Sequence, residues 1–149
     1  MILYKTGDLF LADVDALVNP VNTVGVMGAG LAYQFKLRFF DNFAAYQAAC
    51  YKGELKPGRM FVTATGRKPQ WIINFPTKRH WRDQSRIEDI QSGLEDLVRV
   101  IHENRIRSVA IPPLGCGLGG LNWADVEPLI IEAALQVPGT SVWVYAPGR

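Results

Sequence analysis

The chain has 149 residues, of which 48% are hydrophobic and 20% charged, and its formal net charge is +2. This size and apolar content predict one domain over residues 1–149, with a sizeable core and no room for a second independent domain. No charged segment leads into a long apolar run, and no apolar stretch approaches the roughly 18 residues of a membrane span, which favours a cytoplasmic protein that does not contact membranes.

The first half of the chain alternates apolar runs with polar, glycine-rich breaks. Its spacing predicts strands at residues 2–5, 16–19, 60–65 and 71–75, and helices at about 31–39 and 43–51. The last two strands flank a turn-forming stretch, Gly66–Gln70, so we expect them to form a hairpin.

The second half begins with the clearest helix of the sequence. Ser85 and Glu88 have the spacing of a capping box, and apolar residues then recur on one face to about Asn104. The elements predicted after it are a strand at 108–111, a helix at 122–135 and a strand at 141–145. Strands thus alternate with helices apart from one hairpin, which predicts an α/β fold: a mixed, mostly parallel sheet between two layers of helices.

Two glycine-rich loops follow predicted strands and precede predicted helices, at Gly25–Gly30 and Gly115–Gly120. In α/β sheets this is where ligands bind, because backbone N–H groups at helix N-termini donate hydrogen bonds to anions. Neither loop has the sequence of a P-loop or a dinucleotide fingerprint, and a single loop of this kind is more often a tight turn than a phosphate site. Two glycine loops, each between a predicted strand and a predicted helix, predict a site for the two halves of a diphosphate.

Three polar residues near the first loop are candidate ligand contacts. Asn19 and Asn22 flank a proline at a strand end, and their amides are suited to ribose hydroxyls or to orienting a water, although asparagine in a turn often serves the local backbone. For Asn22 we favour a functional role. Asp8, after a glycine, is suited either to accepting hydrogen bonds from an exocyclic amine or to capping a turn.

Lys78 is the sharpest catalytic candidate, since it follows a strand and its side chain can reach the cleft that the two glycine loops define. A plain surface lysine is the alternative. Cys116 lies within the second loop without an obvious paired histidine, so we interpret it as a small apolar filler. Two cysteines and two histidines give neither a disulfide framework nor a metal-ligand spacing, and we expect no metal or other cofactor.

The basic residues are concentrated in one segment. Residues 67–86 hold six of the sixteen lysines and arginines against a single acid, with two tryptophans and His80 among them. A basic patch interleaved with aromatics is suited to nucleic acid, with Arg79, Trp81 and Arg82 as the candidate contacts. The alternative is a solvated loop whose tryptophans belong to the core.

Several motifs together resemble a macrodomain, and within that family the branch of the terminal ADP-ribose glycohydrolases and the DarG antitoxins. The motifs are Gly7–Phe10, Val18–Asn22, Val26–Ala32, Phe75–Lys78 and Pro113–Trp123, in the expected order and across nearly the whole chain. The resemblance implies a three-layer α/β/α macrodomain, as the catalytic part of a longer antitoxin, with a cleft for ADP-ribose.

The resemblance also implies roles for individual residues. Asp8, with the backbone near Leu9, would bind adenine, the two glycine loops would wrap the diphosphate, and Asn22 and Lys78 would face the distal ribose. Separately from the resemblance, the need for a proton donor to the departing group makes His80 a further catalytic candidate. The residues that it assigns to ADP-ribose binding are Asp8, Leu9, Asn19, Met27, Gly28, Ala29, Gly30, Leu31, Thr77, Leu114, Gly115, Cys116, Gly117, Leu118 and Gly119.

The expected activity is hydrolysis of ADP-ribose from thymine in single-stranded DNA, acting as a monomer against the toxin DarT. In protein-directed relatives an aspartate of the second loop assists the lysine; here Gly119 stands in its place, which favours the DNA branch. Two alternatives remain open from the sequence: a hydrolase of glutamate-linked ADP-ribose on proteins, and a reader that binds ADP-ribose without cleaving it.

Overall fold

Six strands form one sheet in the computed structural model, which describes residues 1–148. The strands are β1 (Ile2–Lys5), β2 (Ala16–Asn22), β3 (Phe61–Ala64), β4 (Trp71–Lys78), β5 (Ser108–Ile111) and β6 (Ser141–Tyr145). Their order is β1-β6-β5-β2-β4-β3, and all neighbours are parallel except the β3–β4 hairpin. The predicted mixed, mostly parallel sheet and its hairpin are confirmed.

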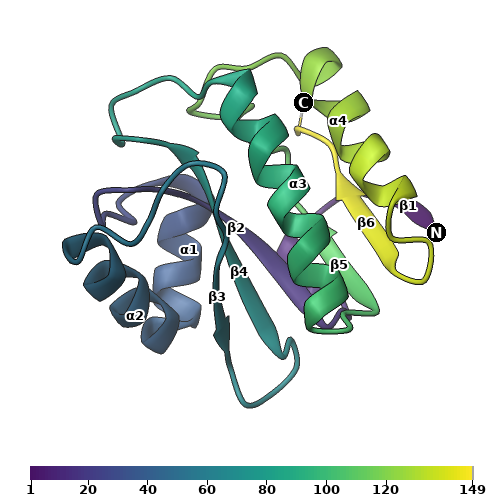
Figure 1. The fold of residues 1–149 in the computed structure, drawn as a ribbon, viewed down its shortest axis with the longest axis horizontal. Helices are drawn as coiled ribbons and strands as arrows, with labels where there is room; N and C mark the ends of the chain where they lie inside the picture. Colours follow the sequence, from purple (N-terminus) through teal and green to yellow (C-terminus); the bar gives the residue numbers. More distant parts are fainter. Residues whose placement is uncertain (149) are drawn as a thin grey trace.

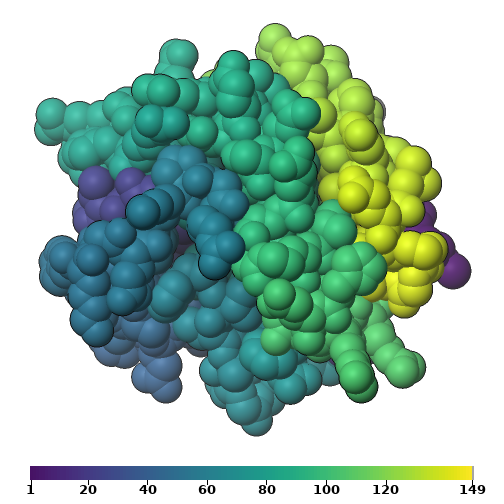
Figure 2. Space-filling view, viewed as in Figure 1, coloured from purple at the N-terminus to yellow at the C-terminus, as the bar shows by residue number. Residues whose placement is uncertain are grey.

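Helices cover both faces of this sheet (Figure 1). The helices are α1 (Gly30–Arg38), α2 (Phe40–Tyr51), α3 (Ile87–Glu103) and α4 (Trp123–Leu135), with a short 3-10 turn, η1, at Leu9–Leu11. Helices α3 and α4 share one core with the sheet, whereas α1 and α2 pack on its other face. Figure 2 shows α3 at the centre of one side of the molecule, with α4 beside it. The predicted three layers are thus confirmed.

Helix α3 follows its sequence pattern closely. Ile90, Leu94, Leu97 and Ile101, which recur at helical spacing, are all buried against the sheet. Burial of each such side chain is worth about 1.5–3 kcal/mol. Gly93 lies on the same face, and a Cβ there would collide with the ring of Phe75 on β4, so glycine permits the close approach of helix and sheet.

The capping box predicted at Ser85 and Glu88 is wrong. The N-cap of α3 is Arg86, which makes no side-chain cap hydrogen bond. The N–H of Ser85 instead donates to the carbonyl oxygen of Gly119 at 2.9 Å, and its buried Oγ has no partner among the protein atoms described. A contact with the second glycine loop therefore replaces the expected local cap.

Strands β2 and β4 extend further than predicted, to Asn22 and Lys78, and β2 runs on beyond its pairing with β5. Strand β5 pairs with β2 only at Ala16 and Leu17, so from Val18 onward β2 has a neighbour on one side alone, β4. Pro20, which lacks an N–H, lies in this part of β2 and is tolerated because no strand faces that edge. The gap between the carboxyl ends of β2 and β5 is where ligands bind in open α/β sheets.

No helix within residues 1–148 is both long enough and apolar enough to cross a membrane.

Candidate functional site

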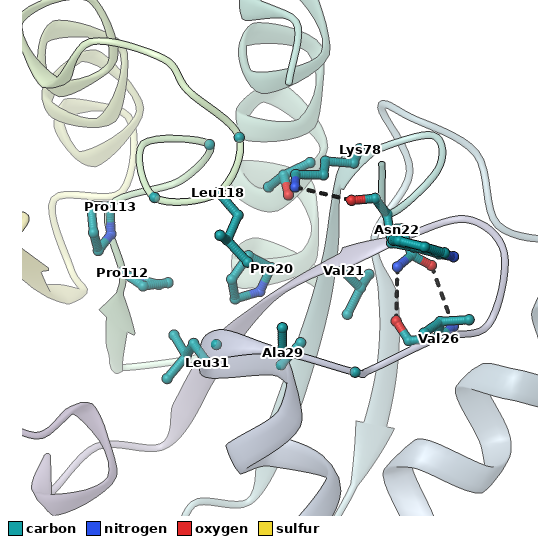
Figure 3. Close-up of a pocket in the computed structure, with 18 residues that line it drawn as sticks. Pro20, Val21, Asn22, Val26, Ala29, Leu31, Lys78, Pro112, Pro113 and Leu118 are labelled. Atoms are coloured by element: carbon teal, nitrogen blue, oxygen red, sulfur yellow. Dashed lines mark hydrogen bonds between the residues drawn. The ribbon is translucent and has the colours of Figure 1, made fainter. Parts of the chain in front are cut away.

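A cavity of about 610 Å³ lies where β2 and β5 separate. Its walls come from the ends of β2 and β4 and from both glycine loops, so segments about 90 residues apart in the chain meet around it. Figure 3 shows Leu118 reaching from the second loop across Pro20, with Ala29 of the first loop and Leu31 of α1 below. A concave site of this volume suits a small molecule.

A second cavity, of about 1020 Å³, adjoins the first. Asp8, Leu9, Arg38 and Tyr145 are among its lining residues. Leu31, Pro112 and Pro113 line both cavities, so the two cavities together form one elongated cleft at the carboxyl ends of the parallel strands. The carboxylate of Asp8 accepts a hydrogen bond from the N–H of Phe10 at 2.9 Å and caps η1, which is the turn-capping alternative predicted for this residue. Asp8 also lines the second cavity.

The first glycine loop begins with a turn that Asn22 organises. Its Oδ1 accepts hydrogen bonds from the N–H groups of Val24 and Val26 at 3.1 and 3.4 Å, and its Nδ2 donates to the carbonyl of Val26 at 2.8 Å. The buried hydroxyl of Tyr46 on α2 also donates to Asn22 Oδ1, at 2.8 Å. The oxygen of this amide is therefore fully engaged in shaping the turn. Figure 3 shows the two hydrogen bonds between Asn22 and Val26.

The second glycine loop leaves no space for side chains at two positions. Gly115 has φ +73°, and a Cβ there would come within 2.8 Å of Leu121 and 3.1 Å of Ser85. At Gly119 a Cβ would collide with the hydroxyl of Ser85 and with the carbonyl oxygen of Gly115. At position 119 the resemblance implies an aspartate in protein-directed relatives. The packing of this loop leaves room only for the glycine found here.

Lys78 ends β4 and lines the cavity close to Asn22, its partner in the strand register. Its Nζ lies 3.4 Å from the carbonyl oxygen of Trp81. The next residue is held twice: the hydroxyl of Thr23 donates to the carbonyl of Arg79 at 2.6 Å, and the guanidinium of Arg79 pairs with Asp89 of α3 at 3.4 Å. Of the three residues predicted to be catalytic, Lys78 and Asn22 meet in the cavity.

The segment after Lys78 carries aromatic and basic groups at the cavity mouth. Trp81 lines the cavity and is 46% exposed, and the guanidinium carbon of Arg82 lies 4.6 Å from the centre of its ring. The ring of His80 is tilted against Trp81 at 5.1 Å, and its Nδ1 accepts a hydrogen bond from the N–H of Arg82. His80 is therefore engaged within this segment and does not line the cavity.

Most residues that the sequence singled out for ADP-ribose lie along the cleft. Those lining the first cavity are Gly28, Ala29, Gly30, Leu31, Thr77, Gly115, Gly117, Leu118 and Gly119. Asn19, Met27 and Leu114 are at most 1% exposed, so their side chains lie beneath the cleft. Asn19, for example, donates to Asn74 at 3.0 Å within a buried amide network.

Cys116 does not line the cavity and packs against the main core. Burial raises the pKa of its thiol, and the Sγ lies 3.5 Å from the carbonyl oxygen of Leu114. A thiol kept protonated is a poor nucleophile. This environment agrees with the interpretation of Cys116 as a filler.

Sequence reasoning missed Tyr46 and Thr23, which hold the first turn and the residue after Lys78. Both contacts are long-range in sequence, and nothing in the local pattern indicates them. Pro112 and Pro113 line both cavities, and neither is among the residues predicted to contact the ligand.

The comparisons with known proteins agree with this geometry. Residues 18–130 match the family model described as Macro domain. The chain is 54% identical over 149 residues to the DNA ADP-ribosyl glycohydrolase of Mycobacterium tuberculosis, covering 99% of this chain and 42% of that protein. It therefore spans less than half the length of this curated relative.

Solved structures give the same picture. The macrodomain of Mycobacterium tuberculosis DarG superposes with a TM-score of 0.98 at 53% identity, covering 99% of both chains. Thermosipho africanus DarTG, solved in complex with ADP-ribose, superposes with a TM-score of 0.90 at 38% identity, covering 97% of this chain and 42% of that one.

Proposed function

This chain belongs to the macrodomain family, and from that premise we propose that it is an ADP-ribosyl glycohydrolase that removes ADP-ribose from thymine in single-stranded DNA. The observation that carries the proposal is the cavity between the two glycine loops, with the amine-bearing Lys78 in its wall. The name of its Mycobacterium tuberculosis relative supports DNA as the carrier of the ADP-ribose.

In this proposal the ligand lies along the whole cleft. Adenosine occupies the second cavity beside Asp8 and Leu9, the diphosphate lies between the glycine loops, and the distal ribose faces Lys78. Backbone N–H groups of glycine-rich turns are suited to phosphate oxygens, because no side chain keeps the anion away. Asn22 contributes by shaping the first turn, since its side-chain oxygen is already engaged.

The proposed reaction breaks the bond between the anomeric carbon of the distal ribose and a thymine nitrogen. The bonding electrons leave with the base, so the ribose gains oxocarbenium character and the base gains negative charge. Lys78 meets this demand in one of two ways. In the first, its neutral amine attacks the anomeric carbon as the base leaves, and water later hydrolyses the adduct and frees the amine. In the second, its ammonium group protonates the departing base while a water adds to the anomeric carbon and returns a proton to the amine. His80 is the second proton donor that we consider, and its engagement with Arg82 makes it the weaker one.

The strand that carries the modified thymine is proposed to cross the cavity mouth at Trp81 and Arg82. An exposed indole offers a surface for base stacking, and a neighbouring guanidinium attracts phosphates. Arg79 contributes less, because its guanidinium is paired with Asp89. The toxin DarT is the proposed partner, supported by the relative named DarTG. We further propose a monomer acting in the cytoplasm.

The test is to incubate the protein with a DarT-modified single-stranded oligonucleotide and, separately, with a glutamate-modified protein. Release of free ADP-ribose from the oligonucleotide is the expected result. Release only from the modified protein would identify a protein-directed hydrolase. Tight binding of ADP-ribose without release from either substrate would identify a reader. Both of these outcomes contradict the proposal.

A further inference from the structure

A hydrogen bond joins the turn after β2 to the residue that follows Lys78. The hydroxyl of Thr23 donates to the carbonyl oxygen of Arg79 at 2.6 Å. In Figure 2 the surface of this turn, in purple, lies against the teal segment that follows β4. Thr23 is only half-buried and lines neither cavity, so its hydroxyl serves the protein backbone and not a ligand.

This bond occurs where the strand ladder is irregular. The register between β2 and β4 shifts after Val21, so that Asn22 pairs with Lys78 and Thr77 is left opposite no residue. Regular ladder bonds therefore do not fix the backbone beyond Lys78. Two contacts from other segments do so: the hydroxyl of Thr23 holds the Arg79 carbonyl, and the carboxylate of Asp89 holds the Arg79 guanidinium.

We propose that Thr23 is a positioning residue for Lys78, a role that rests on the function proposed above. Thr23 follows Asn22 directly, so both residues belong to the turn that leads into the first glycine loop. The same turn therefore also fixes the chain at the carboxyl end of β4. The position of the Lys78 amine relative to the anomeric carbon then depends on this link. A misplacement of about 1 Å in a reacting group lowers turnover by about 100-fold.

The experiment compares Thr23→Val, which keeps the shape but loses the hydroxyl, with Thr23→Ser, which keeps the hydroxyl. A control is Thr65→Val, because Thr65 is also half-buried and its hydroxyl also serves the backbone, in the β3–β4 turn away from the cleft. This hydroxyl contacts the carbonyl oxygens of Pro69 and Arg67, at 2.5 and 2.9 Å, and accepts a hydrogen bond from the N–H of Arg67. For each variant we would measure kcat and KM on the modified oligonucleotide, the dissociation constant of free ADP-ribose, and the melting temperature.

We expect Thr23→Val to lower kcat by about 10-fold or more, a partial form of the misplacement effect, while ADP-ribose affinity stays within about 3-fold of the parent. Thr23→Ser and Thr65→Val should retain the parent kcat. The inference is overturned if Thr23→Val retains the parent kcat, if Thr23→Ser loses as much, or if Thr65→Val falls in parallel. Failure of the proposed function is recognised separately, because the parent protein would then release no ADP-ribose from the oligonucleotide.

Discussion

Tyr46 donates one hydroxyl to both oxygens of Asn22, at 2.8 Å to Oδ1 and 2.9 Å to the backbone carbonyl. The tyrosine is fully buried on α2, whereas Asn22 begins the turn of the first glycine loop. Burial raises the pKa of Tyr46, so the phenol stays protonated and keeps donating across the physiological range. A core residue therefore determines the shape of the ligand cleft.

Tyr46→Phe should loosen this turn without disturbing the core, because the ring is retained. Loss of the buried hydroxyl should cost about 1–2 kcal/mol of the free energy of unfolding. We also expect weaker binding of ADP-ribose, measured by isothermal titration calorimetry. An unchanged affinity would show that the turn keeps its shape without the bond.

Lys78→Ala should abolish release of ADP-ribose from the oligonucleotide while ADP-ribose still binds. Lys78→Arg retains the positive charge but supplies no nucleophilic amine, so partial turnover by this variant indicates the electrostatic role. Capture of a Lys78 adduct by borohydride during turnover, located by mass spectrometry, indicates the covalent role. Full turnover by Lys78→Ala would remove Lys78 from the mechanism.

Trp81→Ala should weaken binding of a modified single-stranded oligonucleotide and leave the affinity for free ADP-ribose unchanged. Stacking of one base on an aromatic side chain is worth about 1–3 kcal/mol. Phe40→Ala is the matched control, because Phe40 is 63% exposed but lines neither cavity. Equal losses from both variants would count against a specific platform at Trp81.

Asp96 should stabilise the fold in a pH-dependent way. Burial alone would raise its pKa, but hydrogen bonds from Arg99 and from the N–H of Met60, with the charge of Arg59 nearby, hold the pKa of Asp96 below its ordinary value. A carboxyl whose pKa is lowered on folding adds stability above its unfolded pKa of about 3.9, and that stability is lost as the pH falls through the folded value. The difference in unfolding free energy between the parent and Asp96→Asn should therefore be constant near neutral pH and shrink in acid. Chemical denaturation at several pH values measures it.

Gly93→Ala should destabilise the protein, although alanine normally favours a helix by about 1 kcal/mol over glycine. The added methyl group collides with the ring of Phe75, and overpacking of this kind costs about 1–3 kcal/mol. Denaturant unfolding of Gly93→Ala checks this. A more stable variant would mean that α3 shifts away from the sheet at little cost.

The parts of the fold that could be predicted are those coded by local periodicity. The apolar face of α3, with Leu94 and Leu97, and the alternation of strands and helices follow directly from residue spacing. The capping box at Ser85 failed because a tertiary contact with Gly119 took the place of the local hydrogen bond. Strand β2 continues three residues beyond the predicted end at Asn19 and includes Pro20, a residue that is rare inside strands. Pro20 is acceptable there because β5 does not pair with this part of β2.

The candidate site could be predicted where glycine clusters and Lys78 mark it, since these signals are local. The sequence did not indicate which residues of these motifs line the cleft and which are buried beneath it. Asn19 and Met27 lie in the same motifs as lining residues, but both side chains are buried: Asn19 donates to Asn74, and Met27 packs against residues of α2. Which residues of a motif face inward depends on tertiary packing that the local pattern does not encode. Thr23 and Tyr46 act through partners 56 and 24 residues away in the chain, which local patterns do not encode.

The wall shared by the two cavities has a consequence for inhibitors. Leu31, Pro112 and Pro113 border both compartments, so two fragments that each fill one compartment would nearly touch at this wall. A short tether between such fragments turns the second binding event into an intramolecular one, with a high effective concentration. The rigid proline pair thus provides a natural joining point for a bivalent ligand.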